Sequence, residues 1–247
     1  MALRNRVALV TGGSRGIGRG IAVRLAQDGA RVAIAYRSNK GAAQQTLLQL
    51  QSGGADCVAV ETDITEPPRA DQLVRTVAER FGRLDVIVNN VGDFRWGTVG
   101  ESSLEDWESI FTSNLNTVLY MSRAALPHMR RGRWGRIINL GAVGAERAFG
   151  QAKISAYAAA KAAVVALSRS LALEEAKNGI TVNVVNPSSI DEKELTLNEA
   201  RRIRDARFPI GRPPTVEDVA AAVAFFASEE AEYVTGQVVN VSGGWML

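Results

Sequence analysis

Residues 11–18 read TGGSRGIG and lie between the apolar run VALV at residues 7–10 and the apolar segment IAVRL at residues 21–25. This order predicts a buried strand, a glycine turn and the start of a helix. Glycine has no Cβ, so a ligand can approach the backbone closely at such a turn. The free N–H groups at the start of a helix stabilise a phosphate. The stretch therefore predicts a site for the pyrophosphate of a dinucleotide.

The rest of the chain alternates strand-like and helix-like segments. Several of the strand-like segments are continuous in Val and Ile, which is typical of a sheet covered by helices on both faces. The alternation predicts a single-domain, Rossmann-type α/β fold, a doubly wound parallel sheet of about seven strands, and no linker or repeat divides residues 1–247. Strands are expected at residues 7–11, 31–36, 56–61, 86–89, 136–140, 181–185 and 238–241, and helices at residues 15–27, 41–51, 68–81, 103–130, 156–177 and 216–227.

Composition excludes several classes of function. The net charge of +3 comes from scattered arginines, so no nucleic-acid partner is expected. The longest apolar stretch, residues 219–227, is too short to cross a bilayer, and no membrane partner is expected. A single cysteine, Cys57, suits the cytoplasm. His128 is the only histidine and is expected on a helix surface. One histidine and one cysteine cannot assemble a zinc site of the usual type, so no metal site is expected. No G-x-S-x-G motif supports a hydrolase.

The end of the second strand selects the cofactor. Residues 36–40 read YRSNK, without the carboxylate that binds the ribose 2′-hydroxyl of NAD. Arg37 there and Arg15 in the glycine turn are placed to accommodate a 2′-phosphate, so the sequence predicts NADPH/NADP. The alternative is that both arginines are solvated surface charges. The cofactor contacts expected from these two segments are Gly12, Ser14, Arg15, Gly16, Ile17, Gly18, Arg37 and Ser38.

Further motifs follow in a familiar order: NNVG at residues 89–92, Asn114, YAAAK at residues 157–161 and SGG at residues 242–244. With the glycine turn, they resemble the short-chain dehydrogenase/reductase family, most closely its 3-oxoacyl-[acyl-carrier-protein] reductases. The resemblance implies reduction of a small carbonyl substrate, such as a 3-oxoacyl thioester on acyl-carrier protein or CoA. It also implies an adenine contact by Asp63 and further cofactor contacts by Ile64, Asn90, Val91, Gly92, Tyr157, Lys161 and Pro187.

The pair Tyr157 and Lys161 also makes chemical sense. Four residues apart on a helix, the two side chains lie on one face. An ammonium group beside a phenol lowers the phenol pKa towards neutrality. Tyr157 would then protonate the carbonyl oxygen while NADPH delivers hydride, and Lys161 would hold the nicotinamide ribose. By resemblance, Asn114 completes a proton relay through water.

One departure from the family concerns a serine that normally orients the substrate oxygen. Aligning the fifth strand places Ala142 at its position, whereas counting back from Tyr157 leads to Gly144 or Ala145. The loss of such a donor slows the reaction on the order of a hundred- to a thousandfold. Several explanations stay open. Ser155 replaces the missing serine, or it is only the N-cap of its helix. Alternatively, the substrate carries its own polar group, or the serine was changed to alanine by engineering. Three functions stay open: a weakened ketone reductase, a catalytically silent NADPH-binding protein and a pteridine-type reductase.

A second departure follows the sixth strand, where residues 186–190 read NPSSI instead of the family's Pro-Gly. The charged residues 191–207 form either a solvated flap or part of the substrate entrance. For the assembly, we expect the helices at residues 103–130 and 156–177 to pair across a twofold axis. A second contact through the last strand and Trp245 would then give a homotetramer.

Overall fold

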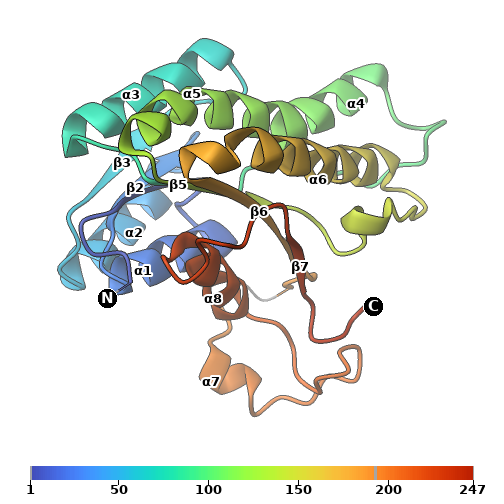
Figure 1. Ribbon diagram of the computed structural model, residues 1–247. Helices are drawn as coiled ribbons and strands as arrows, with labels where there is room; N and C mark the ends of the chain where they lie inside the picture. The colour runs from blue at the N-terminus through green and yellow to red at the C-terminus, as the bar shows by residue number, and fades with distance from the viewer. Residues whose placement is uncertain (1, 192–193, 247) are drawn as a thin grey trace.

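The computed structural model describes residues 2–191 and 194–246. At its centre lies a seven-stranded sheet with the order β3-β2-β1-β4-β5-β6-β7 (Figure 1). All neighbouring strands run parallel, so all their carboxyl ends lie at one edge. The strands are β1 (Val7–Thr11), β2 (Arg31–Tyr36), β3 (Cys57–Glu61), β4 (Val86–Asn89), β5 (Gly135–Leu140), β6 (Ile180–Pro187) and β7 (Val238–Val241).

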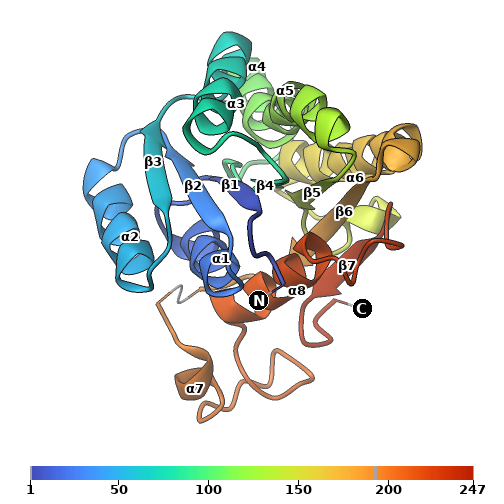
Figure 2. The ribbon, with the colours of Figure 1, turned by 60° about the vertical axis from the view of Figure 1, so that its left-hand side comes forward.

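Helices cover both faces of this sheet. In Figure 2, α1, α2 and α8 lie on one side and α3, α4, α5 and α6 on the other. Two apolar clusters, one on each face, hold the layers together. The helices are α1 (Gly16–Gln27), α2 (Lys40–Ser52), α3 (Pro67–Phe81), α4 (Leu104–Phe111), α5 (Thr117–Gly132), α6 (Ser155–Glu175), α7 (Leu197–Ala200) and α8 (Val216–Ala227).

Burial explains the apolar strands. Every residue of β1, β4 and β5 is buried, because helices cover both sides of these strands. A half-exposed strand would alternate polar and apolar residues instead. The predicted Rossmann-type fold with seven parallel strands is confirmed.

The single helix predicted at residues 103–130 is wrong in one respect. The π-helical turn η1 (Thr112–Asn116) separates α4 from α5. Within and beside it, Ser113 Oγ donates to the carbonyl of Ser109 at 2.9 Å and Thr117 Oγ1 to that of Ser113 at 2.7 Å. Polar side chains that bond to carbonyls of the preceding turn compete with the regular helical pattern, and π turns gather at functional sites.

Two smaller expectations also change. Ser155 does not cap its helix: Ile154 is the N-cap and its carbonyl already accepts from Ala158 N at 2.8 Å, so Ser155 is the first helical residue. The charged segment at residues 191–207 contains a short helix, α7, and a capping box between Thr196 and Glu199 stabilises the start of this helix. Residues 192 and 193 of that segment lie outside the described residues.

One helix is long and apolar enough to cross a membrane by length and composition alone, over Ser155–Asn178. The sequence analysis did not anticipate it. This helix, α6 with its last turn η3 (Ala176–Asn178), packs against β6 and buries the side chain of Lys161. That is the arrangement of a core helix.

A buried polar ladder ties α6 to the sheet. Asn89 Nδ2 donates to Asn139 Oδ1 at 2.8 Å, and Asn139 Nδ2 donates to Ser168 Oγ at 2.8 Å. Asn139 is fully buried, and its partners Asn89 and Ser168 are buried as well, so water does not replace these hydrogen bonds. Ser168, the member of the ladder on α6, lies two helical turns after Lys161. The ladder therefore fixes the position of α6 relative to β5.

Replacing Asn139 by alanine should lower the free energy of unfolding by about 2 kcal/mol, because buried partners on Asn89 and Ser168 lose their hydrogen bonds. Urea denaturation measures this loss. The matched control is Asn198→Ala on the exposed face of α7, where a change within ~0.5 kcal/mol is expected. Equal stability of the two variants would show that the ladder does not hold α6.

Candidate active site

The loops that leave the carboxyl ends of the strands enclose a cleft. It opens beside the switch between β1 and β4, where chain connections diverge to the two sides of the sheet. Two cavities, of about 170 Å³ and about 640 Å³, share Gly12, Arg15 and Val91 and so form one cleft. The first is lined by Gly12, Ser14, Arg15, Ala35, Tyr36, Arg37, Ser38, Asn39, Thr62, Asp63, Ile64, Thr65, Val91, Asp93 and Ser113. The second is lined by Gly12, Arg15, Gly16, Ile17, Gly18, Asn90, Val91, Gly92, Phe94, Asn114, Leu140, Gly141, Tyr157, Lys161, Pro187 and Glu194.

Every residue that the sequence analysis assigned to the site lines this cleft. The analysis missed others, among them Asp93, Phe94, Ser113 and Glu194. Phe94 and Asp93 directly follow the NNVG motif, and this position was the available signal. Ser155 and Ser188 are not among the lining residues, although Ser188 Oγ is buried without a hydrogen-bond partner.

The glycine turn is built for close approach. Gly12 and Gly16 have positive φ values of 62° and 53°. A Cβ on Gly18 would lie 2.2 Å from the carbonyl oxygen of Gly12, so no larger residue fits. Asn90 Nδ2 fastens the turn from β4 by donating to the carbonyls of Thr11 at 3.0 Å and Gly12 at 3.3 Å.

The first turn of α1 is open to an anion. The side chain of its N-cap, Arg15, makes no capping hydrogen bond, and the first turn of the helix contains no acidic residue. The unpaired N–H groups and the dipole together favour a phosphate group at this point. The turn thus fits the pyrophosphate of a dinucleotide.

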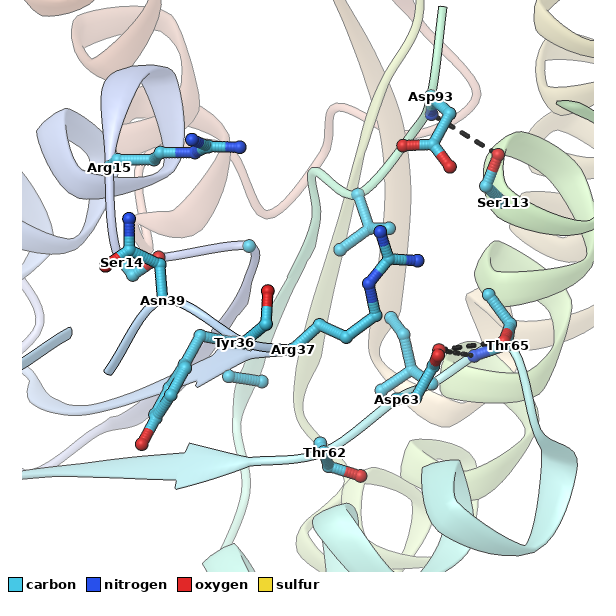
Figure 3. A pocket seen from close by; sticks show the side chains of 15 residues that line it. Ser14, Arg15, Tyr36, Arg37, Asn39, Thr62, Asp63, Thr65, Asp93 and Ser113 are labelled. Atoms are coloured by element: carbon cyan, nitrogen blue, oxygen red, sulfur yellow. Dashed lines mark hydrogen bonds between the residues drawn. The ribbon is translucent and has the colours of Figure 1, made fainter. Parts of the chain in front are cut away.

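The smaller cavity carries two cations. Figure 3 shows Arg15 and Arg37 pointing into it from the glycine turn and from the end of β2. Asp63 lies beneath Arg37 and accepts from Thr65 N at 3.0 Å and Thr65 Oγ1 at 2.7 Å. Burial raises the pKa of Asp63, but these hydrogen bonds and the charge of Arg37 outweigh it and hold the pKa below its usual value. Asp63 is therefore ionised at neutral pH.

Three polar side chains gather in the larger cavity. Lys161 is 5% exposed, and its Nζ donates to the carbonyl of Leu140 at 2.7 Å. The same Nζ lies 5.6 Å from the centre of the Tyr157 ring. Asn114 is fully buried, and its Nδ2 donates to the carbonyls of Asp93 at 2.8 Å and Ile110 at 3.0 Å.

The carbonyl oxygen of the Asn114 side chain is buried and has no hydrogen-bond partner among residues 2–191 and 194–246. A Cβ placed on Gly92 would lie 2.3 Å from this Oδ1 and 3.5 Å from Lys161 Nζ, so the two groups converge above Gly92. A buried acceptor without a partner is unusual in a native structure and calls for a ligand or water. The π turn of η1 is what carries Asn114 to this place.

Burial sets the ionisation of the pair. It raises the pKa of Tyr157 to about 12 and lowers the pKa of Lys161 to about 8. The expectation that Lys161 brings the phenol pKa towards neutrality is therefore wrong for this ligand-free geometry. The loss of water disfavours both charged forms, and the ammonium is directed at the Leu140 carbonyl.

No second hydroxyl accompanies Tyr157. Among the described residues that line the larger cavity, Tyr157 carries the only hydroxyl group. Ala142 follows the lining residues Leu140 and Gly141 at the end of β5. The site thus holds a phenol, an ammonium group and an amide, without the serine expected from the family resemblance.

A parallel Rossmann-type sheet with a glycine turn and a Tyr-x-x-x-Lys pair on one cleft defines a nucleotide-dependent oxidoreductase. The chain belongs to the short-chain dehydrogenase/reductase family: residues 12–246 match the family model described as enoyl-(acyl carrier protein) reductase. It is 39% identical over 250 residues to the 3-oxoacyl-[acyl-carrier-protein] reductase FabG of Vibrio cholerae, and the match covers 100% of both chains.

Two solved structures are also similar. One is a blue fluorescent protein from a metagenomic library in complex with NADPH, with 37% identity, 100% of both chains covered and a TM-score of 0.89. The other is a short-chain dehydrogenase from Burkholderia cenocepacia J2315 in complex with NADP, with 37% identity, 99% of both chains covered and a TM-score of 0.88. Their cofactors agree with the NADPH/NADP predicted from the sequence.

The Tyr157 phenol should stay protonated well above the pH at which an exposed tyrosine ionises, near ~10, because burial disfavours the phenolate. In protein labelled with carbon-13 at tyrosine Cζ, we expect no ionisation shift for Tyr157 below pH ~11. Tyr157→Phe assigns the signal. Ionisation of Tyr157 at or below pH ~10, the value of an unperturbed tyrosine, would contradict this account.

Proposed function

We propose that this protein is an NADPH-dependent reductase of a ketone, with Tyr157 as the proton donor. The convergence of Tyr157, Lys161 and Asn114 on the cleft that also contains the glycine turn carries the proposal. The similarity to 3-oxoacyl-[acyl-carrier-protein] reductases favours a 3-oxoacyl thioester-like substrate, carried on acyl-carrier protein or CoA. A cytoplasmic location and a homotetramer remain predictions.

The residues of the cleft fit NADPH along its length. The glycine turn and the open start of α1 suit the pyrophosphate. Arg37, Arg15 and Ser38 would hold the 2′-phosphate, and Asp63 and Ile64 would contact the adenine. On the other side of the turn, residues 90–92 and Pro187 border the space for the nicotinamide, and Lys161 would hold its ribose.

Bound NADPH supplies the hydride that reduces the carbonyl carbon. Tyr157 supplies the proton to the carbonyl oxygen, and its raised pKa keeps the phenol protonated at neutral pH. Lys161, with a pKa of about 8, is mostly protonated at neutral pH and stabilises negative charge that develops on the phenol oxygen. The open Asn114 Oδ1 offers an acceptor for the water that returns a proton towards Lys161.

The absence of a hydroxyl at Ala142 favours a second candidate, a protein that binds NADPH without chemistry. A silent protein has no chemical need for a buried lysine, whose burial is unfavourable when it is charged. We therefore retain the reductase as the main proposal and expect its turnover to be limited by orientation of the substrate oxygen.

NADPH should bind at least about tenfold more tightly than NADH, since hydrogen bonds from arginine to a phosphate are charge-assisted. Arg37→Asp should reverse this preference, because a carboxylate repels the 2′-phosphate and accepts from the 2′-hydroxyl. Titration of cofactor fluorescence measures both affinities. Arg75→Asp, an exposed arginine of α3 outside the cleft, is the control. Equal affinity of the unmodified protein for both cofactors would refute the assignment.

Ala142→Ser should raise kcat with a 3-oxo ester or thioester roughly ten- to a hundredfold, by restoring a donor to the substrate oxygen. Tyr157→Phe should abolish turnover, as it removes the proton donor. Oxidation of NADPH is followed by its absorbance, with Ala152→Ser in the exposed loop before α6 as the control. If Ala142→Ser gives no gain and Tyr157→Phe changes nothing, the protein binds NADPH without chemistry.

A further inference from the structure

An aromatic row leads from solvent to the proposed proton donor. The rings of Phe94 and Tyr157 meet edge to face with centres 5.0 Å apart, and those of Phe94 and Trp96 do the same at 5.0 Å. Phe94 is 45% exposed and Trp96 is 66% exposed. Phe94 lines the larger cavity beside Tyr157. Phe94 thus connects the exposed Trp96 ring to the cavity that contains Tyr157.

The row is held in place by its own loop. Gly97 N donates to the carbonyl of Lys153 at 2.9 Å, and Gly97 forms an isolated parallel bridge with Ile154. This bridge fastens the aromatic loop to the segment that leads into Tyr157. Thr98 closes the next turn, with its carbonyl accepting from Ser102 Oγ at 2.9 Å. An exposed aromatic surface that is already ordered binds a ligand with little loss of conformational entropy.

Two of the charged side chains closest to the row form ion pairs. Arg95, between the two aromatic residues, forms an ion pair with Asp106, and Glu194 at the cleft pairs with Arg19. The Lys161 ammonium is directed at the carbonyl of Leu140. The surface that the row presents therefore suits a neutral, apolar group.

The wall of the cavity at the end of β5 carries few side-chain atoms. Leu140 and Gly141 line it, and Ala142 follows. A Cβ on Gly141 would lie 2.0 Å from the Oδ1 of Asn186, so this position excludes a side chain. At Gly141 the wall of the cavity therefore consists of backbone without a side chain.

From the ordered aromatic row and this small-residue wall, we infer that the substrate is a 3-oxo ester or thioester with an aryl group on its keto carbon. The aryl ring would pack against Phe94 and Trp96, and this contact would place the carbonyl beside the Tyr157 hydroxyl. Aromatic pairs gain stability beyond the area that they bury, so a flat aryl ring is favoured over a saturated ring of similar size. The inference rests on the proposed reductase function and narrows its substrate.

The test compares ethyl benzoylacetate with ethyl 3-cyclohexyl-3-oxopropanoate, which differ only in the ring. The ratio of their kcat/KM values is measured with NADPH for the unmodified protein, Phe94→Leu, Trp96→Leu and the control Tyr233→Leu. Differences in intrinsic reactivity cancel when these ratios are compared between proteins. We expect the aryl preference to fall ~2- to 10-fold in the first two variants and to stay constant in the control. An unchanged ratio in both variants would overturn the inference.

A binding measurement separates this inference from the reductase proposal. With NADP bound, ethyl benzoylacetate should quench the fluorescence of Trp96, and Trp96→Phe should remove most of this quenching. Quenching without turnover would refute the reductase and leave the aryl site supported. Turnover with equal quenching in Trp96→Phe and the unmodified protein would refute the aryl site and leave the reductase supported.

Discussion

The parallel direction of all seven strands is the constraint on which the site depends. It brings the carboxyl ends of β1, β4 and β5 to one edge, and the divergence of connections between β1 and β4 opens a cleft there. Asn90 then links the two neighbouring strand ends by hydrogen bonds to the glycine turn. The nucleotide-binding turn and the proposed catalytic groups are therefore parts of one rigid arrangement rather than two separate sites.

Removal of water governs the chemistry of this arrangement. Burial favours the neutral phenol of Tyr157 and makes the charged form of Lys161 less stable. Lys161 is held in place relative to β5 by its hydrogen bond to the Leu140 carbonyl and by the ladder through Asn139. Two residues beyond the end of this strand lies Ala142, at the position where the family resemblance implies a serine. If the protein is the proposed reductase, contacts elsewhere in the cleft would have to orient the substrate oxygen in place of this hydroxyl.

Much of the fold and of the site could be predicted from the sequence, because buried parallel strands produce continuous Val and Ile runs and the glycine turn has a fixed spacing. The π turn around Asn114 could not, since the helical pattern of residues 103–130 continues through it and only side-chain bonds to carbonyls reveal it. Spacing placed Tyr157 beside Lys161 but gave no measure of burial, so the direction of the pKa shift was mispredicted. Phe94 was missed because a contact distant in sequence, between Gly97 and Ile154, directs its loop.

The central claim is that one cleft brings a cofactor hydride and the Tyr157 proton to the same carbonyl group. The most direct measurement uses NADPH carrying deuterium at both hydrogen positions of nicotinamide C4 with a 3-oxo ester, followed by mass spectrometry of the alcohol product. The account predicts one deuterium on the carbinol carbon in the unmodified protein and no alcohol in Tyr157→Phe. Tight binding of the labelled cofactor without any deuterated alcohol would contradict it.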